Sequence, residues 1–288
     1  MNKRHCAAGS RIFLRQLRHD LRQGILARWM YAVPILLFTL FMALSFRNQI
    51  DFLNSSLDDP LPVTFADACI YLFEGMDIYT PTSESRFEIP VFFLVNNIYL
   101  LFMTAYYPIK DLFGAGKLFL LKSRRRSTAW ASKCVWLLLS TALIYLLEYG
   151  VIFLLTAGPN ALTPTPELQQ LLHRYDPAIW QGGAWAIFIF LLPFLTTLTL
   201  GMVQLVISLL WVPLAGFVVD VVILVASAYY FSPLLIGNYA MLLRSSLLIE
   251  NGIRYPAAIA VEIAILAVLA LAGGLYFKRY DILEHRKG

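Results

Sequence analysis

The sequence predicts an all-α integral membrane protein. Apolar residues make up 59% of the 288 residues, above the roughly 45–50% of a soluble domain, and only 14% are charged. The apolar residues gather into runs of about 18 to 27, the length that a helix needs to cross about 30 Å of hydrocarbon. We therefore expect a single transmembrane domain over residues 1–288, which excludes most soluble enzymes.

Residues 11–28, the first element, are predicted to form an amphipathic interfacial helix on the inner membrane surface. Leu14, Leu17, Leu21 and Ile25 recur at helical spacing, so their side chains can enter the membrane. Arginines on an adjacent stripe can reach lipid phosphates. These arginines are Arg11, Arg15, Arg18 and Arg22. The alternative is an ordinary basic flank that happens to be helical.

Six transmembrane helices are predicted to follow. The run from Ala184 to Phe231 would reach roughly 72 Å as one helix at about 1.5 Å per residue. It must therefore fold back near Ser208 to Pro213, because Trp211 offers an interface anchor and Pro213 a helix start. The predicted spans are residues 29–46, 89–109, 134–156, 184–207, 213–231 and 257–277.

Lysine and arginine residues gather on one side of this arrangement. The N-terminal segment, the loop between the second and third spans and the C-terminal tail hold eighteen of the 23. Loops rich in these residues stay cytoplasmic. We therefore expect a multi-pass protein of the cell membrane with both termini in the cytoplasm. Orientation and contact with membrane lipid explain the net charge of +5, so nucleic-acid binding is not expected.

The segments on the opposite side are predicted to be partly ordered. Residues 47–88 form an acidic external loop, with short helical pieces near residues 65–73 and Cys69 among them. Residues 158–183 form a proline-rich cap. Residues 232–256 are too apolar for a solvated loop, yet their prolines, glycines and charges forbid a clean span. Re-entrant extracellular helices before the sixth transmembrane helix fit both facts.

No catalytic or metal-binding motif is evident in the sequence. The four histidines lie outside the spans, and none is paired at metal-ligand spacing. Gly116 and Lys117 superficially resemble a phosphate loop, but Leu118 stands where Ser or Thr is needed. We therefore expect no enzyme, no metal and no ATP site on this chain.

Three acidic residues fall inside predicted spans: Glu148, Asp220 and Glu262. A charge in hydrocarbon is costly, so such groups usually face a bundle interior, a hydrated cavity or a partner. One interpretation is the lining of a translocation path, with candidates Asn96, Asn97, Glu148, Gln204, Asp220 and Glu262. Alternatively, Glu262 favours the positive N-terminal end of its helix, and Glu148 reaches Arg174 or Arg244.

The basic loop after the second span carries the most specific pattern. A glycine, an apolar pair, a Ser-Arg segment and a lysine that opens the third span occur in order, as Gly114, Leu120, Leu121, Ser123, Arg124 and Lys133. Together with the interfacial helix, the six spans and the broken segment before the sixth, this loop resembles the permease subunit of type 2 ABC exporters. The chain departs from the family pattern at Asp111, a displaced acid, and at Lys122, which replaces a proline.

The resemblance implies a transport subunit that moves a hydrophobic or amphipathic substrate out of the cell. Lys110 to Leu121 is similar to the coupling helix that receives motion from a separate ABC ATPase subunit. ATP and magnesium would bind that partner, and a second permease copy or a homologue would complete the path. The implied ATPase-coupling residues are Lys110, Asp111, Phe113, Gly114, Lys117, Arg124, Arg125 and Arg126.

Two other classes of membrane protein stay open on the sequence. A non-transporting membrane anchor, sensor or immunity protein could have six helices without an ATPase-docking surface. In that case Arg124 to Arg126 only determine the membrane topology and contact anionic lipid. A secondary transporter predicts inverted internal repeats, and no convincing repeat relates the first three spans to the last three.

Overall fold

The computed structural model describes residues 2–81, 87–114, 116–117, 126–156, 158, 161–173 and 178–279. Within these ranges the chain is all helix, turn and loop, and its one β-bridge joins Ser245 and Ile253. The all-α prediction is therefore confirmed. Five helical segments are long and apolar enough to cross a membrane: Arg11–Asn54, Val91–Phe113, Arg126–Thr156, Ala184–Leu210 and Tyr255–Arg279.

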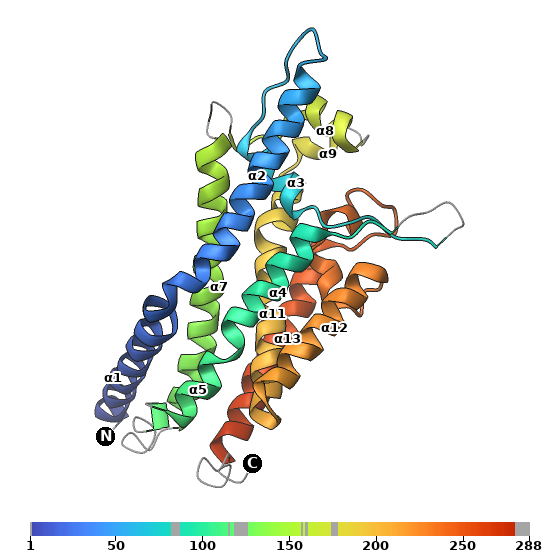
Figure 1. Ribbon diagram of the computed structural model, residues 1–288. Helices are drawn as coiled ribbons and strands as arrows, with labels where there is room; N and C mark the ends of the chain where they lie inside the picture. Colours follow the sequence, from blue (N-terminus) through green and yellow to red (C-terminus); the bar gives the residue numbers. More distant parts are fainter. Residues whose placement is uncertain are drawn as a thin grey trace.

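Helix α11 (Leu192–Leu210) lies at the centre of the bundle. It packs against α4 (Val91–Ala105), α7 (Arg126–Thr156), α12 (Pro213–Tyr229) and α13 (Tyr255–Arg279) (Figure 1). Three short elements precede it: α9 (Ala178–Gln181), α10 (Ala184–Ala186) and the π-helical η3 (Ile187–Leu191). The chain reverses at Trp211 and Val212, so the long apolar run forms two packed helices.

Helix α12 is an apolar helix that packs along the bundle but is shorter than the five candidate spans. Its 17 residues give it a length of about 25 Å at 1.5 Å per residue. That length is at the lower limit of the roughly 17–25 residues that span a bilayer.

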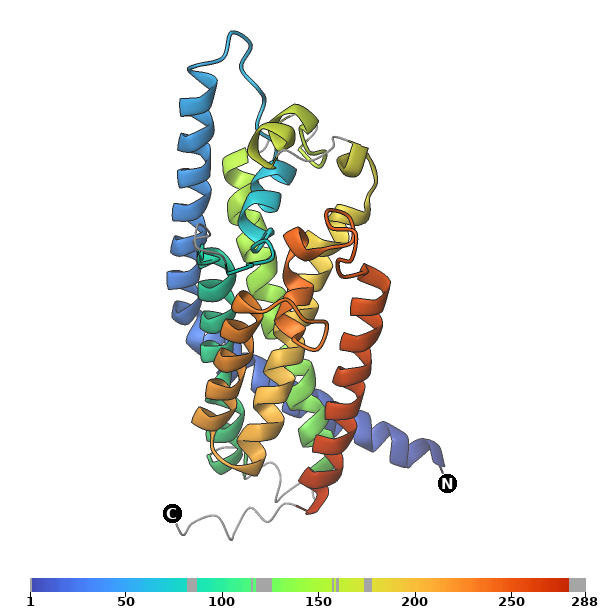
Figure 2. The same cartoon turned by 90° about the vertical axis from the view of Figure 1, so that its right-hand side faces the viewer.

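The N-terminal helix is longer than the predicted segment and ends earlier. Helix α1 (Asn2–Asp20) continues through a π turn, η1 (Leu21–Ile25), and a 3₁₀ turn, η2 (Leu26–Ala32), into α2 (Val33–Asn54). The backbone bends at Arg28, whose φ and ψ are −123° and 18°. Figure 2 shows α1 running sideways from the foot of α2.

The two faces of α1 differ in chemistry. Gln16 and Asp20 are buried where α1 packs against α7. Leu14 is 61% exposed, and the arginine stripe at positions 11, 15, 18 and 22 is exposed throughout. Two polar residues of α1 therefore pack on the bundle, which the leucine pattern did not indicate, while Leu21 and Ile25 of that pattern pack against the core just beyond α1.

Several helices begin or end at residues other than those predicted, and polar contacts outside the apolar runs accompany these differences. Helix α2 continues past residue 46, because Arg47 Nη1 donates to Leu155 O at 3.0 Å and the Asn54 amide exchanges two 3.0 Å bonds with the Leu61 backbone. The predicted second span is divided at Tyr106 into α4 and the short α5 (Tyr107–Phe113). Helix α7 begins at Arg126, ahead of the apolar residues.

Helix α3 (Phe65–Phe73) occupies the core rather than an external loop. It packs against α2, α4 and α7, beside α2 at the end of the bundle away from α1 (Figure 1). Almost all of its residues are buried, and the pKa of the Cys69 thiol is raised by that burial. The helical piece was predicted; that Cys69 is buried in the hydrophobic core was not.

Asp67 joins α3 to the proline-rich cap, which contains α8 (Pro166–His173). Its Oδ2 accepts hydrogen bonds from Thr64 N at 3.0 Å and Thr64 Oγ1 at 2.8 Å, as in a capping box. Its Oδ1 accepts from Thr165 N at 2.9 Å and Gln169 Nε2 at 2.8 Å. One buried carboxylate thus holds two segments that are distant in the sequence.

Arg244 anchors the segment before α13. This segment contains two 3₁₀ turns, η4 (Ile236–Ala240) and η5 (Leu242–Arg244). The Arg244 guanidinium is buried and donates to the carbonyls of Ser227 and, at 2.8 Å, Ala228 at the C-terminal end of α12. Burial lowers the pKa of Arg244 to about 10, but the negative end of the helix favours its cation.

Replacing Asp67 with Ala should lower the free energy of unfolding by about 3 kcal/mol, because the buried donors at Thr165 and Gln169 lose their acceptor. The midpoint of thermal unfolding in detergent should fall by roughly 6–12 °C. The matched control is Asp58→Ala, since Asp58 is exposed. Equal midpoints for the two variants would show that Asp67 does not hold the cap.

Candidate functional site

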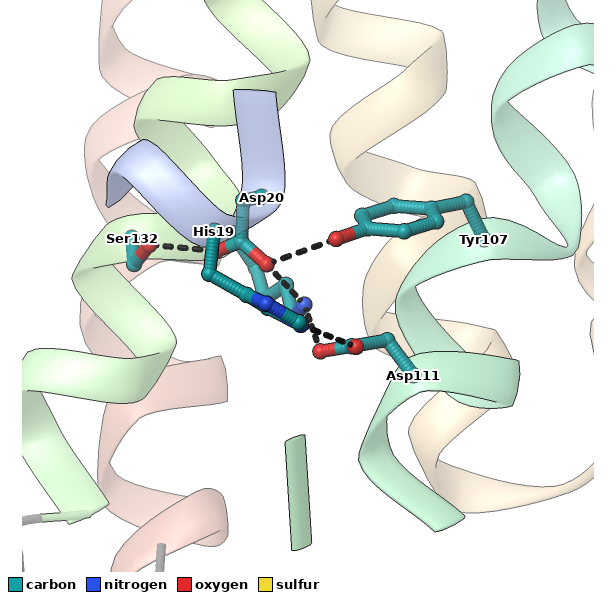
Figure 3. A network of polar contacts seen from close by, with 6 residues as sticks. His19, Asp20, Tyr107, Asp111 and Ser132 are labelled. Atoms are coloured by element: carbon teal, nitrogen blue, oxygen red, sulfur yellow. Dashed lines mark hydrogen bonds and ion pairs between the residues drawn. The ribbon is translucent and has the colours of Figure 1, made fainter. Parts of the chain in front are cut away.

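A cluster of charged and polar side chains joins α1, α5 and α7 at one end of the bundle (Figure 3). Lys133 Nζ lies 2.5 Å from Asp20 Oδ1 and 2.6 Å from Asp111 Oδ2. The three side chains are only 10%, 3% and 8% exposed. A charge so far removed from water is stable only when it is paired, so each charge depends on the others.

Neighbouring side chains complete this cluster. Tyr107 donates its hydroxyl proton to Asp20 Oδ1 at 2.9 Å, and Ser132 donates to Asp20 Oδ2. His19 Nε2 lies 2.9 Å from Asp111 Oδ1. We call the set of His19, Asp20, Tyr107, Asp111, Ser132 and Lys133 the junction cluster.

Local helix geometry brings the junction cluster together. Tyr107 and Asp111 stand four residues apart on α5, so their side chains share one face of that helix. His19 and Asp20 end α1, and Ser132 and Lys133 are adjacent on α7. Among the described residues, no three His, Cys, Asp or Glu side chains are grouped as a metal site would require. The cluster links α1, α5 and α7 through hydrogen bonds and ion pairs.

The residues proposed for ATPase coupling divide between the two faces of α5 and the loop beyond it. Asp111 points into the junction cluster, while Lys110, Phe113 and Gly114 are exposed, Phe113 by 43%. Lys117 is half-buried. Arg126 starts α7 and donates to Lys278 O at 2.9 Å. Five further residues from the family pattern or the proposed coupling set lie outside the described residues: Leu120, Leu121, Ser123, Arg124 and Arg125.

Two of the polar residues proposed for a path meet between α4 and α7. Asn96 Nδ2 lies 3.4 Å from Glu148 Oε2, which is a long hydrogen bond. Asn97 Oδ1 accepts a hydrogen bond from Thr197 Oγ1 at 2.6 Å, and the Tyr145 hydroxyl lies 2.8 Å from the same threonine oxygen. A string of polar contacts thus links α4, α7 and α11.

The other path candidates lie on both sides of α11. Glu262 Oε1 accepts from Thr196 Oγ1 at 2.6 Å, and Gln204 Nε2 donates to Leu101 O at 3.2 Å. Neither carboxylate oxygen of Asp220 has a hydrogen-bond partner within the described parts of the chain. The structure therefore provides partners for two of the three intramembrane acids, Glu148 and Glu262, and none for Asp220.

All six path candidates are enclosed by packing, with exposed fractions of 0% to 2%. In this conformation a substrate could reach them only if the helices separated. The alternative pairing of Glu148 with Arg244 is wrong, because the guanidinium binds carbonyls at the end of α12. Arg174 lies outside the described residues. Glu262 is beyond the first turn of α13, so Thr196, rather than the helix end, supplies its contact.

Sequence reasoning singled out Asp111 and Lys133 but missed the other members of the junction cluster. Asp20 is an acid inside a strongly basic segment, which is the one signal that could have pointed to it. His19, Tyr107 and Ser132 carry no such signal. They are identified only by the packing of α1 and α5 on α7.

No protein-family model, curated protein or solved structure matches this chain.

Replacing Lys133 with Met should lower the free energy of unfolding by about 3–5 kcal/mol, because two buried carboxylates lose their counter-ion. Chemical denaturation in mixed micelles would measure the change. Lys110→Met on the exposed face of α5 is the control. Adding Asp111→Asn to Lys133→Met should recover part of the loss. A loss no larger than that of the control, or no recovery, would contradict the pairing.

Proposed function

We propose that this chain is the permease subunit of an ATP-driven ABC exporter, which moves a hydrophobic or amphipathic substrate out of the cell. A separate ATPase subunit binds ATP and magnesium. The observation that carries the proposal is the attachment of α5 to α1 and α7 through the junction cluster. A short helix that is attached to two long helices can transmit to them a force applied from outside the membrane.

The two faces of α5 suit a coupling role. Its inner face buries Tyr107 and Leu112 and directs Asp111 to Lys133. Its outer face leaves Lys110 and Phe113 exposed for a cytoplasmic partner. Helix α5 follows α4 directly at Tyr106, and the ion pairs of Asp111 attach it to α7 as well, so a force on α5 can act on α7.

The proposed topology has six spans, in which α12, the fifth along the chain, is added to the five candidate spans. Helices α1 and α5 and the end of α13 lie at the same end of the bundle (Figure 1). The exposed arginines of α1 favour a cytoplasmic location for that end of the bundle. Both termini then lie in the cytoplasm of a cell-membrane protein. Helix α3 and the 3₁₀ turns held by Arg244 are then extracellular re-entrant elements that close the outer end.

The second permease copy, or a homologue, packs in this proposal on an apolar face of the bundle. Val218, Val222 and Val225 recur at helical spacing on α12 and are 49%, 60% and 51% exposed. Small β-branched side chains allow close helix packing in a membrane. The intramembrane acids and amides become accessible to substrate when the helices separate during transport.

An ABC ATPase subunit should co-purify with the affinity-tagged chain from native membranes in mild detergent, and the complex should hydrolyse ATP. In a Lys110→Glu/Phe113→Ala variant, the amount of bound ATPase should fall about tenfold, since loss of an anchoring contact of about 1.4 kcal/mol has that effect. Mass spectrometry of the purified subunits measures it.

Arg254→Glu is the matched control, because Arg254 is exposed at the opposite end of the chain's last helix. It should keep the ATPase subunit. A chain that purifies stably without any ATPase would instead favour a non-transporting anchor, sensor or immunity protein.

A further inference from the structure

A cavity of about 210 Å³ opens at the bend between α1 and α2. The turns η1 and η2 form one wall, and α2, α4 and α7 form the others. Its lining is almost entirely hydrocarbon, with Leu100, Ile144 and Leu147 among the lining side chains. A cavity with such walls favours an alkyl chain over water.

Two polar groups near one end of the cavity lack a partner among the described residues: a cation lacks a counter-ion, and an N–H donor lacks an acceptor. Arg28 lies at the backbone bend with its guanidinium carbon 5.2 Å from the centre of the Tyr107 ring, and no described carboxylate forms an ion pair with it. Trp136 is 2% exposed, and its buried Nε1 has no hydrogen-bond acceptor among the described residues. A buried donor without an acceptor is costly.

Both groups are neighbours of the Tyr107 ring. The rings of Tyr107 and Trp136 are 4.7 Å apart, and Arg28 stands over Tyr107. Gly24 packs against the Trp136 indole, where any side chain would collide with Nε1 and, at 2.8 Å, with the Tyr107 ring. Arg28 is therefore the cation that this end of the apolar cavity offers to a ligand.

The rim of the cavity is suited to a bilayer. Trp29 and Tyr31 line it and are exposed, and Met30 between them is exposed as well. Tryptophan and tyrosine prefer the boundary between hydrocarbon and headgroups. The preceding helix exposes its arginine stripe, which concentrates anionic lipid near the bend.

We propose that this cavity binds one acyl chain of an anionic phospholipid, whose phosphate is held by Arg28. The acyl chain fills the apolar part between α2, α4 and α7. The phosphate supplies the negative charge that the described residues leave unprovided at this end. This site does not depend on export, and it adjoins the junction cluster through Tyr107.

The test uses the full-length chain in detergent, with phosphatidylglycerol and phosphatidylcholine offered together, followed by native mass spectrometry. One phosphatidylglycerol per chain should stay bound under conditions that remove phosphatidylcholine. Arg28→Gln should reduce the retained phosphatidylglycerol about tenfold. Arg15→Gln is the matched control, because Arg15 is exposed on α1 and does not line the cavity. It should retain the lipid.

Leu147→Trp gives an independent test, because it fills the cavity without changing charge. This variant should keep its helical circular dichroism and lose the bound lipid. An excess of inorganic phosphate should not displace the lipid, since the acyl chain contributes to binding. Equal retention of the two lipids by the unmodified chain, or undiminished retention by both variants, would overturn the proposal.

Discussion

A buried lysine between two carboxylates fixes the arrangement of one end of this bundle. The Lys133 side chain is only 10% exposed, and Asp20 and Asp111 are the counter-ions that compensate the cost of its burial. The carboxylates come from α1 and α5, so three helices are positioned by one cation. Arg244 has a similar role at the other end, where it binds the carbonyl end of α12. Between these two cations the bundle is mostly apolar.

The three intramembrane acids illustrate the same constraint inside the bundle. Glu148 and Glu262 each have one oxygen bonded to an amide or hydroxyl and one without a partner among the described residues. Asp220 has neither, and Ser208 Oγ on the facing helix α11 also lacks a partner there. Polar groups left in this way are costly in hydrocarbon. The polar groups between α11 and α12 therefore have fewer hydrogen-bond partners than Glu148 and Glu262 have.

The fold class could be predicted because apolar runs and their lengths follow directly from the thickness of a bilayer. Helix ends were less predictable, since Arg47 and Asn54 extend α2 through partners far along the chain. A short helix near residues 65–73 was predicted, but its burial depends on α7 and the cap, which lie far along the chain. Within the junction cluster, Asp20 could not be paired with Lys133 from sequence spacing, because they lie 113 residues apart.

The Asp67 contact also affects how the chain is made. Its acceptor oxygen is satisfied by Gln169, 102 residues later. At about 5–20 residues per second, translation of that interval takes roughly 5–20 s. During this time α3, although apolar, lacks both α7 and the cap that cover it. The contacts that bury this helix are therefore completed only after the cap has been synthesised.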